Sequence, residues 1–510
     1  MSMYRRYLLL AGTGLFWIGI LSPSPAATQS RSCEGLSSID LPDTKVTSAT
    51  TINPMPGGKV QVETSSPPVQ VSTPFCRVEG IIEKEIRFEV WLPSQGWNGK
   101  FLGEGSGGYA GSISYRAMAD ALAHGYATAS TDTGHQASSN DSKWALGHPE
   151  RVLNYGHRAH HLLAQTAKKI VASYYGTGSQ RSYFVGCSGG GRQALAEAQR
   201  YPEDYDGVIA GASGSAFTHM IANLRWVSQL NAKDAPGRLS PRKAALIANA
   251  AIAYCDPQDG FKDGVIDNPL NCDFDISKLQ CPAGTDNDTC LTAAQLETAR
   301  KIYSPMRNSA GQEIYPGLTP GTLLNISDSG DGLNRYNTMT ADFFKYFVYA
   351  DPNWDWRVFN IDGDVADADA KVGPIVNVTD PNLKPFKARG GKLIMYHGWA
   401  DNVVSPLTSL NYYKRVQEVI GERETDEFFR IFLVPGMYHC GGGPGCNEFD
   451  MVRAIEDWVE KGKAPDRVIA SKKTDGKVNQ TRPLCPYPQI ASYKGSGSLD
   501  DAANFTCESR

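Results

Sequence analysis

The chain has 510 residues and a formal net charge of -4 at pH 7, and no block of like charges interrupts it. This length exceeds one ordinary domain, so it predicts a core that carries a large insertion, or two domains. The small net charge gives no reason to expect nucleic acid or an anionic membrane as a partner, and it favours a small-molecule ligand.

Residues 1–27 are typical of a cleaved secretion signal. Basic Arg5 and Arg6 precede an apolar run from Tyr7 to Leu21, and small residues follow at 24–27. A retained membrane anchor is the alternative, but the apolar run is short for a bilayer span. We therefore expect a secreted or periplasmic protein that has no membrane partner after signal cleavage.

An alternation of strands and helices follows the N-terminal region. Residues 28–80 are rich in Ser, Thr, Pro and Val, and the alternating pattern at 59–63 predicts an antiparallel edge region. The expected strands after it are 86–92, 100–103, 126–130, 182–186 and 207–211, and the expected helices are 115–124, 157–174 and the segment that follows residue 189. This alternation predicts an α/β fold whose mostly parallel sheet is covered on both faces.

The alternation stops between residues 215 and 387, which predicts an inserted lid domain. That segment contains helical pieces at 242–254 and 293–303, together with many Asp, Asn and Gly residues. The rhythm then returns with strands 392–396 and 428–434 and helices 406–420 and 449–460, and Ser405 is the expected N-cap before Pro406. Residues 28–214 and 388–510 are thus the two parts of the main domain, and 215–387 form the lid.

The most informative motif is Gly186-Cys187-Ser188-Gly189-Gly190, which directly follows an expected strand. A serine between glycines on a sharp strand-to-helix turn can project its hydroxyl clear of the backbone, as in a nucleophile elbow. Residues 191–200 are rich in helix formers, so strand, turn and helix come in the order that the elbow requires. Ser188 is therefore the candidate nucleophile.

A serine nucleophile needs a histidine base and an acid that orients it, and α/β-hydrolase chains carry them in the order Ser, acid, His. Of the histidines after Ser188, His219 follows too closely and His397 precedes its acidic neighbour, so His439 is the candidate base. Asp401 is the candidate acid, because both residues follow expected strands, at the sheet edge where α/β folds bind ligands. Taken singly, Asp401 could be a turn residue and His439 a surface residue.

Eleven cysteines without a CxxC pair indicate disulfides in an exported chain rather than a thiolate metal site. Their spacing suggests four local bridges, although sequence does not fix connectivity: Cys33 with Cys76, Cys255 with Cys272, Cys281 with Cys290 and Cys485 with Cys507. If Ser188 and His439 meet, Cys187 and Cys440 come within bridging distance and would lock the two loops together. The alternative makes Cys187 itself the nucleophile, and Cys446 is left over.

Ester cleavage passes through a tetrahedral oxyanion, which needs backbone N–H donors. Gly189, directly after the nucleophile, is one candidate. The second is Gly107 or Gly108, in the glycine-rich loop that follows the strand at 100–103. A phosphate-binding role for this loop is the alternative, but the lysine and spacing of a P-loop are missing, and no organic cofactor is expected.

Two further clusters fall in the expected lid. Residues 256–267 concentrate carboxylates between Cys255 and Cys272, and hard oxygen ligands suit calcium, although the spacing is not that of an EF-hand. A solvated acidic loop is the alternative. An aromatic cluster at 343–349, with Trp354 and Trp356, could stack on a planar aromatic group or form the core of the lid.

Three motifs closely resemble those of the tannase and feruloyl esterase family: Gly-Cys-Ser-Gly-Gly-Gly-Arg at 186–192, Tyr-His-Gly-Trp-Ala-Asp at 396–401 and Met-Tyr-His-Cys-Gly-Gly-Gly at 437–443. The resemblance covers nearly the whole mature chain, with further matching segments at 130–135, 158–160 and 201–212. One departure, a glycine at the position after Gly189 in a motif where members often have threonine, leaves the elbow intact.

The resemblance implies an α/β-hydrolase fold with a large inserted lid, the triad of Ser188, Asp401 and His439, and a bridge between Cys187 and Cys440. It also implies a structural calcium ion in the lid, held by Asp256, Asp259 and Asp263 and by the carbonyls of Phe261 and Val265.

The activity that the resemblance implies is that of a secreted serine carboxylesterase acting on small-molecule esters of aromatic acids. Feruloyl esters attached to plant polysaccharide are the first choice of substrate. Galloyl esters, as in tannase, and terephthalate monoesters are alternatives with the same chemistry. A non-catalytic binding protein on the same scaffold is the alternative from another class.

Overall fold

The structure is a computed structural model that describes residues 30–54, 58–62, 67–326 and 336–509. Its central sheet has nine strands in the order β1-β4-β5-β7-β6-β8-β9-β12-β13. Their bounds are β1 Thr44–Ile52, β4 Phe75–Ile82, β5 Ile86–Pro93, β6 Lys100–Glu104, β7 Ala127–Thr131, β8 Arg181–Cys187, β9 Gly207–Gly211, β12 Lys392–Gly398 and β13 Phe429–Val434. The expected secretion signal, residues 1–27, lies outside the described residues.

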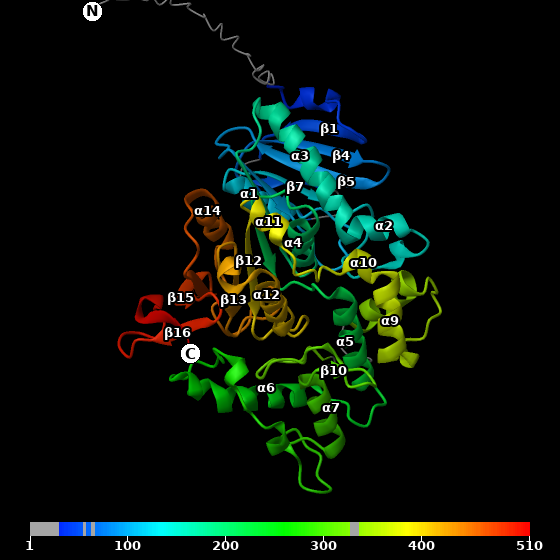
Figure 1. Ribbon diagram of the computed structural model, residues 1–510, viewed down its shortest axis with the longest axis vertical. Helices are drawn as coiled ribbons and strands as arrows, with labels where there is room; N and C mark the ends of the chain where they lie inside the picture. Colours follow the sequence, from blue (N-terminus) through cyan, green and yellow to red (C-terminus); the bar gives the residue numbers. More distant parts are fainter. Residues whose placement is uncertain (1–29, 55–57, 63–66, 327–335, 510) are drawn as a thin grey trace, which may run out of the picture.

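Neighbouring strands from β7 to β13 run parallel, and those from β1 to β7 run antiparallel. Helices α1 (Tyr115–Ala123) and α14 (Met451–Lys461) pack in one apolar core against the sheet, whereas α3 (Ala159–Tyr175), α4 (Gly189–Arg200) and α12 (Pro406–Ile420) contribute to another. Figure 1 shows these helices around the central strands. The predicted α/β architecture, a mostly parallel sheet covered on both faces, is confirmed.

The N-terminal region does form an antiparallel edge of the sheet, as predicted. The edge strand is β1, however, and not the alternating segment at 59–63. Strand β1 pairs with β4 along most of its length. The alternating segment at 59–63 does not join this sheet: Lys59–Val60 (β2) pairs with Val69–Gln70 (β3) in a separate two-stranded ribbon. Pro67 and Pro68 come directly before β3 and offer no N–H to extend this pairing.

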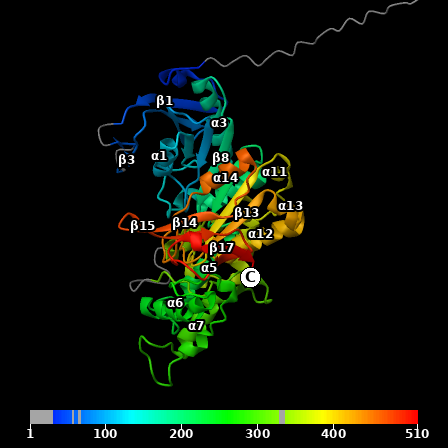
Figure 2. The ribbon, with the colours of Figure 1, turned by 90° about the vertical axis from the view of Figure 1, so that its left-hand side faces the viewer.

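Between β9 and β12, no described residue joins the central sheet. This stretch builds a mainly helical unit, most of which lies in the lower half of Figure 1. Its apolar core also takes in main-domain residues such as Tyr109, Trp144 and Tyr155. Its elements are α5 Phe217–Leu230, α6 Pro241–Cys255, α7 Ala293–Tyr303, the hairpin of β10 Met306–Arg307 and β11 Glu313–Tyr315, α8 Tyr336–Phe343, α9 Ile361–Lys371 and α10 Gly373–Val376, and α11 Lys384–Ala388 leads back to the sheet. Figure 2 shows α5, α6 and α7 of this unit below the sheet. This unit falls within the segment expected to be an inserted lid, 215–387, and we call it the lid; its bounds as a separate domain stay a prediction.

The aromatic cluster of the lid is largely buried. Phe343 and Phe347 pack against each other with ring centroids 5.3 Å apart, and Phe344 stacks on Trp354. Trp356 lies against the guanidinium of Arg225, 4.3 Å from its ring centroid. These contacts favour the interpretation that the cluster forms the core of the lid.

The remaining helices are α2 Pro149–Leu153, which continues into a π-helical turn at Asn154–Arg158, and α13 Glu422–Asp426. Ser405 occupies the N-cap position of α12 as predicted, but its hydroxyl does not cap the helix. It donates instead to the carbonyl of Gly317 in the lid, 2.7 Å away, because Ser405 is buried against that segment.

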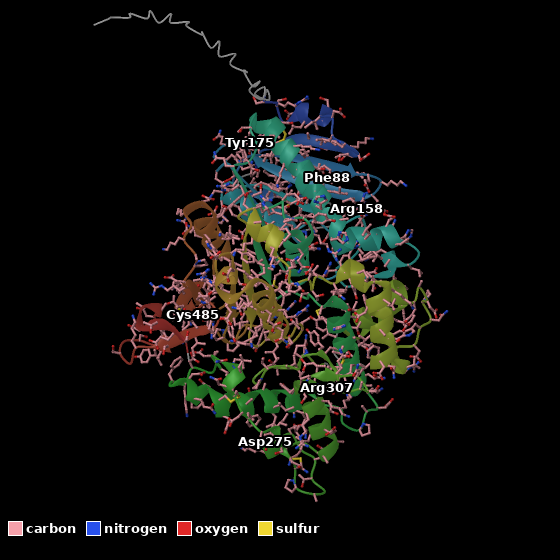
Figure 3. All side chains as sticks on the ribbon, viewed as in Figure 1. Phe88, Arg158, Tyr175, Asp275, Arg307 and Cys485 are labelled. Atoms are coloured by element: carbon pink, nitrogen blue, oxygen red, sulfur yellow. A yellow bond between two sulfur atoms is a disulfide. The ribbon has the colours of Figure 1, made fainter. Side chains whose placement is uncertain are left out.

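The C-terminal region forms two antiparallel hairpins. They consist of β14 Val468–Thr474 with β15 Lys477–Leu484, and β16 Gln489–Tyr493 with β17 Phe505–Ser509. Figure 3 labels Cys485 between them, where it is bonded to Cys507. Among the described residues, no helix combines the length and the apolar character needed to cross a membrane.

Asp132, directly after β7, provides a pH-dependent prediction. Burial raises the pKa of its carboxyl to about 7, against hydrogen bonds from the Gly134 and Arg87 N–H groups that lower it. The folded state therefore holds a proton that an unfolded chain loses near pH 4, so stability declines as pH rises from about 4 to 7. In thermal melts, Asp132→Asn should show a flatter decline of Tm than wild type across this window. Parallel Tm profiles for the two proteins would contradict the prediction.

Candidate active site

Ser188 lies at the turn from β8 into α4 with φ 61° and ψ -120°, a strained conformation for a residue other than glycine. The turn is possible because its neighbours lack side chains. A Cβ on Gly186 would lie 2.4 Å from the backbone of Gly190, and one on Gly191 would lie 2.1 Å from the carbonyl of Gly211. The local geometry is that of a nucleophile elbow.

Three side chains from distant parts of the chain form one hydrogen-bonded line. Nε2 of His439 lies 2.8 Å from Oγ of Ser188, and Nδ1 of His439 lies 2.7 Å from Oδ2 of Asp401. Because an ionised carboxylate only accepts, Nδ1 carries the proton and Nε2 is free to accept from the serine hydroxyl. The structure therefore brings together the nucleophile, base and acid candidates in the geometry of a catalytic triad.

Asp401 is fully buried and accepts four hydrogen bonds. Two come from the backbone N–H groups of Val403 and Val404, at 2.8 and 3.0 Å, and two from histidine rings. Burial acts to raise the pKa of Asp401, but the charge of His439 and the hydrogen bonds from both histidines outweigh it and hold the pKa well below its usual range. The carboxylate thus stays ionised beside the imidazole.

The second histidine bonded to Asp401 is His397, which chain order excluded as the base. It is fully buried, with Nε2 3.1 Å from Oδ2 of Asp401 and Nδ1 2.8 Å from Oγ of Ser409 in α12. His397 therefore bonds the same carboxylate oxygen as His439 does and helps to hold it in place. The sequence held one signal for this contact: His397 lies near the end of β12, only four residues before Asp401.

Cys187 and Cys440 are joined in a disulfide, with Cα atoms 6.0 Å apart. This bond contradicts the alternative in which Cys187 is a free nucleophile, because a disulfide sulfur is no thiolate. The other paired cysteines form the four bridges that spacing suggested: Cys33–Cys76, Cys255–Cys272, Cys281–Cys290 and Cys485–Cys507. Cys446 is free and buried, and burial raises the pKa of its thiol to about 11.

The Cys187–Cys440 bridge connects the residue before Ser188 to the residue after His439, so its loss should affect turnover. For the double variant Cys187→Ser, Cys440→Ser we expect kcat to fall about tenfold, because small misplacements of reacting groups are costly. The fold should persist with a modest loss of Tm, since β8 keeps its pairing with β6 and β9, and β13 keeps its pairing with β12. Steady-state kinetics and thermal melts test this, and unchanged turnover would refute it.

The two candidate sources of oxyanion donors lie in contact. A Cβ on Gly189 would lie 2.8 Å from the carbonyl oxygen of Gly108 and 3.0 Å from that of Ser106, so the glycine-rich loop passes directly over the start of α4. Gly108 has φ 57°, and a side chain there would meet the carbonyl of Ser139 at 2.2 Å. A Cβ on Gly107 would have no heavy atom within 4 Å.

The acidic loop of the lid holds its carboxylates through backbone N–H groups. Asp256 accepts from the N–H groups of Asp263 and Gly264, and Asp259 accepts from that of Asp267. Asp263 also pairs with Arg482 at 2.6 Å. Burial, and then repulsion from Asp259 and the other nearby aspartates, raises the pKa of Asp267 to about 8.

The calcium ligand set expected in this loop is chemically suitable, because it consists of oxygen donors whose negative charges repel one another. Of the two residues expected to offer carbonyls, Val265 is buried, and the ring of Phe261 packs on Phe505. The three aspartates do not converge in this structure. Within the described chain, the one group that brings three possible metal-ligand side-chain atoms within 4.8 Å of one another is His161, Glu203 and Asp204, in the main domain.

Comparison with known proteins gives consistent matches. The model of a family described as tannase and feruloyl esterase matches residues 70–508. An uncharacterized esterase of Xanthomonas campestris is 36% identical over 94% of this chain and 92% of its own length. A probable feruloyl esterase B-2 of Aspergillus terreus is 34% identical over 86% of each chain.

Solved structures agree with these matches. The crystal structure of feruloyl esterase B from Aspergillus oryzae superposes with a TM-score of 0.86 and 30% identity, covering 93% of this chain and 99% of that one. The tannin acyl hydrolase of Aspergillus niger superposes with a TM-score of 0.75 at 22% identity, covering 95% of this chain and 94% of that one, a likeness of fold.

Proposed function

We propose, since this chain belongs to the tannase and feruloyl esterase family and is a carboxylic ester hydrolase, that it cleaves esters of hydroxycinnamic-type aromatic acids with Ser188 as its nucleophile. The observation that carries the proposal is the unbroken line from Ser188 through His439 to Asp401, with hydrogen bonds of 2.8 and 2.7 Å. A non-catalytic binding protein would have no use for this strained and fully connected arrangement.

In the first half of the reaction, Oγ of Ser188 attacks the ester carbonyl carbon while Nε2 of His439 takes the hydroxyl proton. Asp401 keeps the imidazole in the required orientation and stabilises its positive charge. N–H groups of Gly189 and of Gly107 or Gly108 hold the developing oxyanion. The tetrahedral intermediate collapses to the acyl-enzyme as His439 gives its proton to the departing alcohol oxygen.

In the second half, His439 takes a proton from water, whose oxygen attacks the acyl carbon. Collapse of the second intermediate breaks the bond to Oγ, releases the aromatic acid and returns the proton to Ser188. All proton transfers pass through Nε2 of His439.

A hydrolysis panel tests the substrate class. We expect methyl ferulate to be cleaved with a higher kcat/KM than methyl gallate or mono(2-hydroxyethyl) terephthalate. Feruloyl groups attached to plant polysaccharide are then the natural substrate. If methyl gallate or the terephthalate ester is preferred, the substrate class is galloyl esters or terephthalate monoesters instead. If none of the three is cleaved and a fluorophosphonate fails to label Ser188, the proposal is overturned.

We propose further that the protein is exported to the periplasm or the medium. The five disulfides support this location, because such bonds persist in oxidising compartments. The N-terminal segment expected to be the signal supports it as well. N-terminal sequencing of the protein from the culture medium or periplasm should find a start close to residue 28.

A calcium ion bound in the lid by Asp256, Asp259 and Asp263, with the carbonyls of Phe261 and Val265, is our proposal for the acidic loop. When bound, it would neutralise charge and stabilise the loop closed by Cys255–Cys272. It has no part in the acyl transfer, which this chain's triad carries out.

Calcium removal should lower stability more than turnover. We expect EGTA to lower Tm by about 3 to 5 °C, because a ligand at 100 times its Kd stabilises by about 2.7 kcal/mol, and kcat at 25 °C to change less than threefold. Isothermal titration should detect Ca²⁺ binding that Asp259→Asn abolishes. Asp275→Asn, at an exposed helix cap outside the loop, is the matched control. Equal Tm values with and without Ca²⁺ would exclude the site.

A further inference from the structure

The glycine-rich loop at 105–108 rests on the first turn of α4. A Cβ on Gly105 would lie 2.8 Å from Cα of Gly190, and one on Gly190 would lie 3.4 Å from the nitrogen of Ser106. Backbone thus touches backbone along this contact. At these glycines the loop has no side chain that could fix the distance between the loop and α4.

One side chain of α4 supplies a directional bond at this contact. Oε1 of Gln193 accepts a hydrogen bond from the backbone N–H of Ser106, at 2.9 Å, and Gln193 is 1% exposed. Ser106 is buried as well. A buried N–H that lost this acceptor would be left unsatisfied, so the loop would shift to find another partner.

The bond lies directly before the candidate oxyanion donor. The peptide N–H of Gly107 comes next in the chain after that of Ser106, and among the residues that the structure describes neither it nor the N–H of Gly108 donates to another group. Beyond it, Gly107 accepts from the N–H of Ala110, and Tyr109 donates to the carbonyl of Ser139. The segment around Gly107 is therefore fixed on one side by Gln193 and on the other by this turn.

Helix α4 carries three of the groups in this arrangement. Ser188 stands at its N-cap, Gly189 opens its first turn and Gln193 lies one turn further along. A helix is a rigid element, so a single body sets the distances between the nucleophile, the first oxyanion donor and the group that holds the second one. Preorganised donors of this kind stabilise charge in the transition state without rearrangement.

We propose that Gln193 is a positioning residue: by accepting from the N–H of Ser106 it holds the Gly105–Ser106 peptide, and it thereby directs the next N–H, that of Gly107, at the oxyanion. The inference rests on the proposed esterase function. It takes Gly107 as the second donor because its N–H is the next one after the N–H that Gln193 holds, and it gives Gln193 a role in transition-state binding without contact to substrate.

The test compares Gln193→Leu with Gln193→Glu and with Gln199→Leu. The first removes the acceptor, and the second keeps an acceptor oxygen in either protonation state. The third is the matched control in the same helix, because Gln199 donates to the carbonyl of Val378 and to the hydroxyl of Tyr412, away from the loop. Each protein is assayed for kcat and KM with methyl ferulate, for inhibition by an aryl boronic acid and by ferulic acid, and for Tm.

For Gln193→Leu we expect kcat and boronate affinity to fall together by about 10- to 100-fold, since a displaced donor costs somewhat less than a deleted one. The KM and the inhibition constant for ferulic acid should stay within threefold, because neither ground-state ligand carries a tetrahedral oxyanion. Gln193→Glu should keep kcat within threefold of wild type. Gln199→Leu should lower Tm with kcat and boronate affinity unchanged.

The proposal is overturned if Gln193→Leu behaves like Gln199→Leu, with a lower Tm and unchanged kcat and boronate affinity. It is also overturned if folded Gln193→Glu loses as much turnover as Gln193→Leu, a comparison that remains decisive where the leucine variant does not fold. Ser188→Ala is run in parallel. Wild-type turnover that survives Ser188→Ala rejects the esterase mechanism itself, an outcome separate from either result at Gln193.

Discussion

Replacing Ser188 with alanine is expected to lower kcat about 10⁶-fold, the largest effect of any single substitution in this chain. The alanine variant has no atom to attack the ester carbonyl, so His439 and Asp401 lose the group that they activate. Substrate binding should change little, because the hydroxyl is a small part of the site. Some acceleration over water should persist from the oxyanion donors and from substrate orientation.

Two measurements check this expectation. Steady-state kinetics give the loss of kcat, and a fluorophosphonate probe should label wild type and leave Ser188→Ala unlabelled. Ser182→Ala is the matched control, because Ser182 lies at the other end of β8 and its hydroxyl contacts Ser179, 3.2 Å away. Equal labelling of wild type and Ser188→Ala would show that another residue is the nucleophile.

Replacing Asp401 with asparagine is expected to lower kcat about 10⁴-fold, with KM close to that of wild type. The carboxylate keeps Nδ1 of His439 protonated and balances the charge that the imidazole gains. An amide is neutral and can turn its NH2 toward Nδ1, which would place the ring proton on Nε2. The ring could then no longer accept the proton of Ser188.

The hydrogen bonds from Val403, Val404 and His397 should keep the loop folded in this variant, so Tm is the second measurement. Asp450→Asn is the control for the same chemical change, because Asp450 caps α14 by accepting from the N–H of Arg453. Its kcat should equal that of wild type. A loss smaller than tenfold for Asp401→Asn would mean that Asp401 does not orient the base.

The elbow and the order of the triad could be predicted from sequence because they are local. Glycines around Ser188 report a backbone requirement that no other residue meets, and strands that end just before Asp401 and His439 place both residues at one sheet edge. The local disulfides were predictable for the same reason, since their partners are close in the chain.

Contacts made across the fold could not be predicted in this way. In the sequence, Gln193 is one polar residue in a helical pattern, and nothing there indicates its bond to Ser106, which lies 87 residues earlier in the chain. His397 is excluded as a base by chain order, and its bond to Asp401 depends on how the strand end curls toward α12. The hydroxyl of Ser405 likewise turns to Gly317, a partner that lies 88 residues away.

The elements of the lid and the C-terminal hairpins were difficult to predict from the sequence for a different reason. Several lid helices are short, and their apolar residues face one another instead of a single sheet, so no regular period marks them. The pairs β14–β15 and β16–β17 are stabilised by packing on the main domain and by Cys485–Cys507. Isolated hairpins are marginal, so their sequence alone carries a weak signal.

The covalent link between Cys187 and Cys440 spans 253 positions and encloses both cysteine pairs of the lid. During biosynthesis, the serine therefore emerges long before the histidine and aspartate that activate it, and the nascent polypeptide has no complete hydrolytic machinery until the whole insertion has followed. The enclosed pairs can oxidise first, as soon as each short loop is made. Of these three bridges, Cys187–Cys440 can close last, so the loops that carry the serine and the histidine are tied together only after the whole insertion has been made.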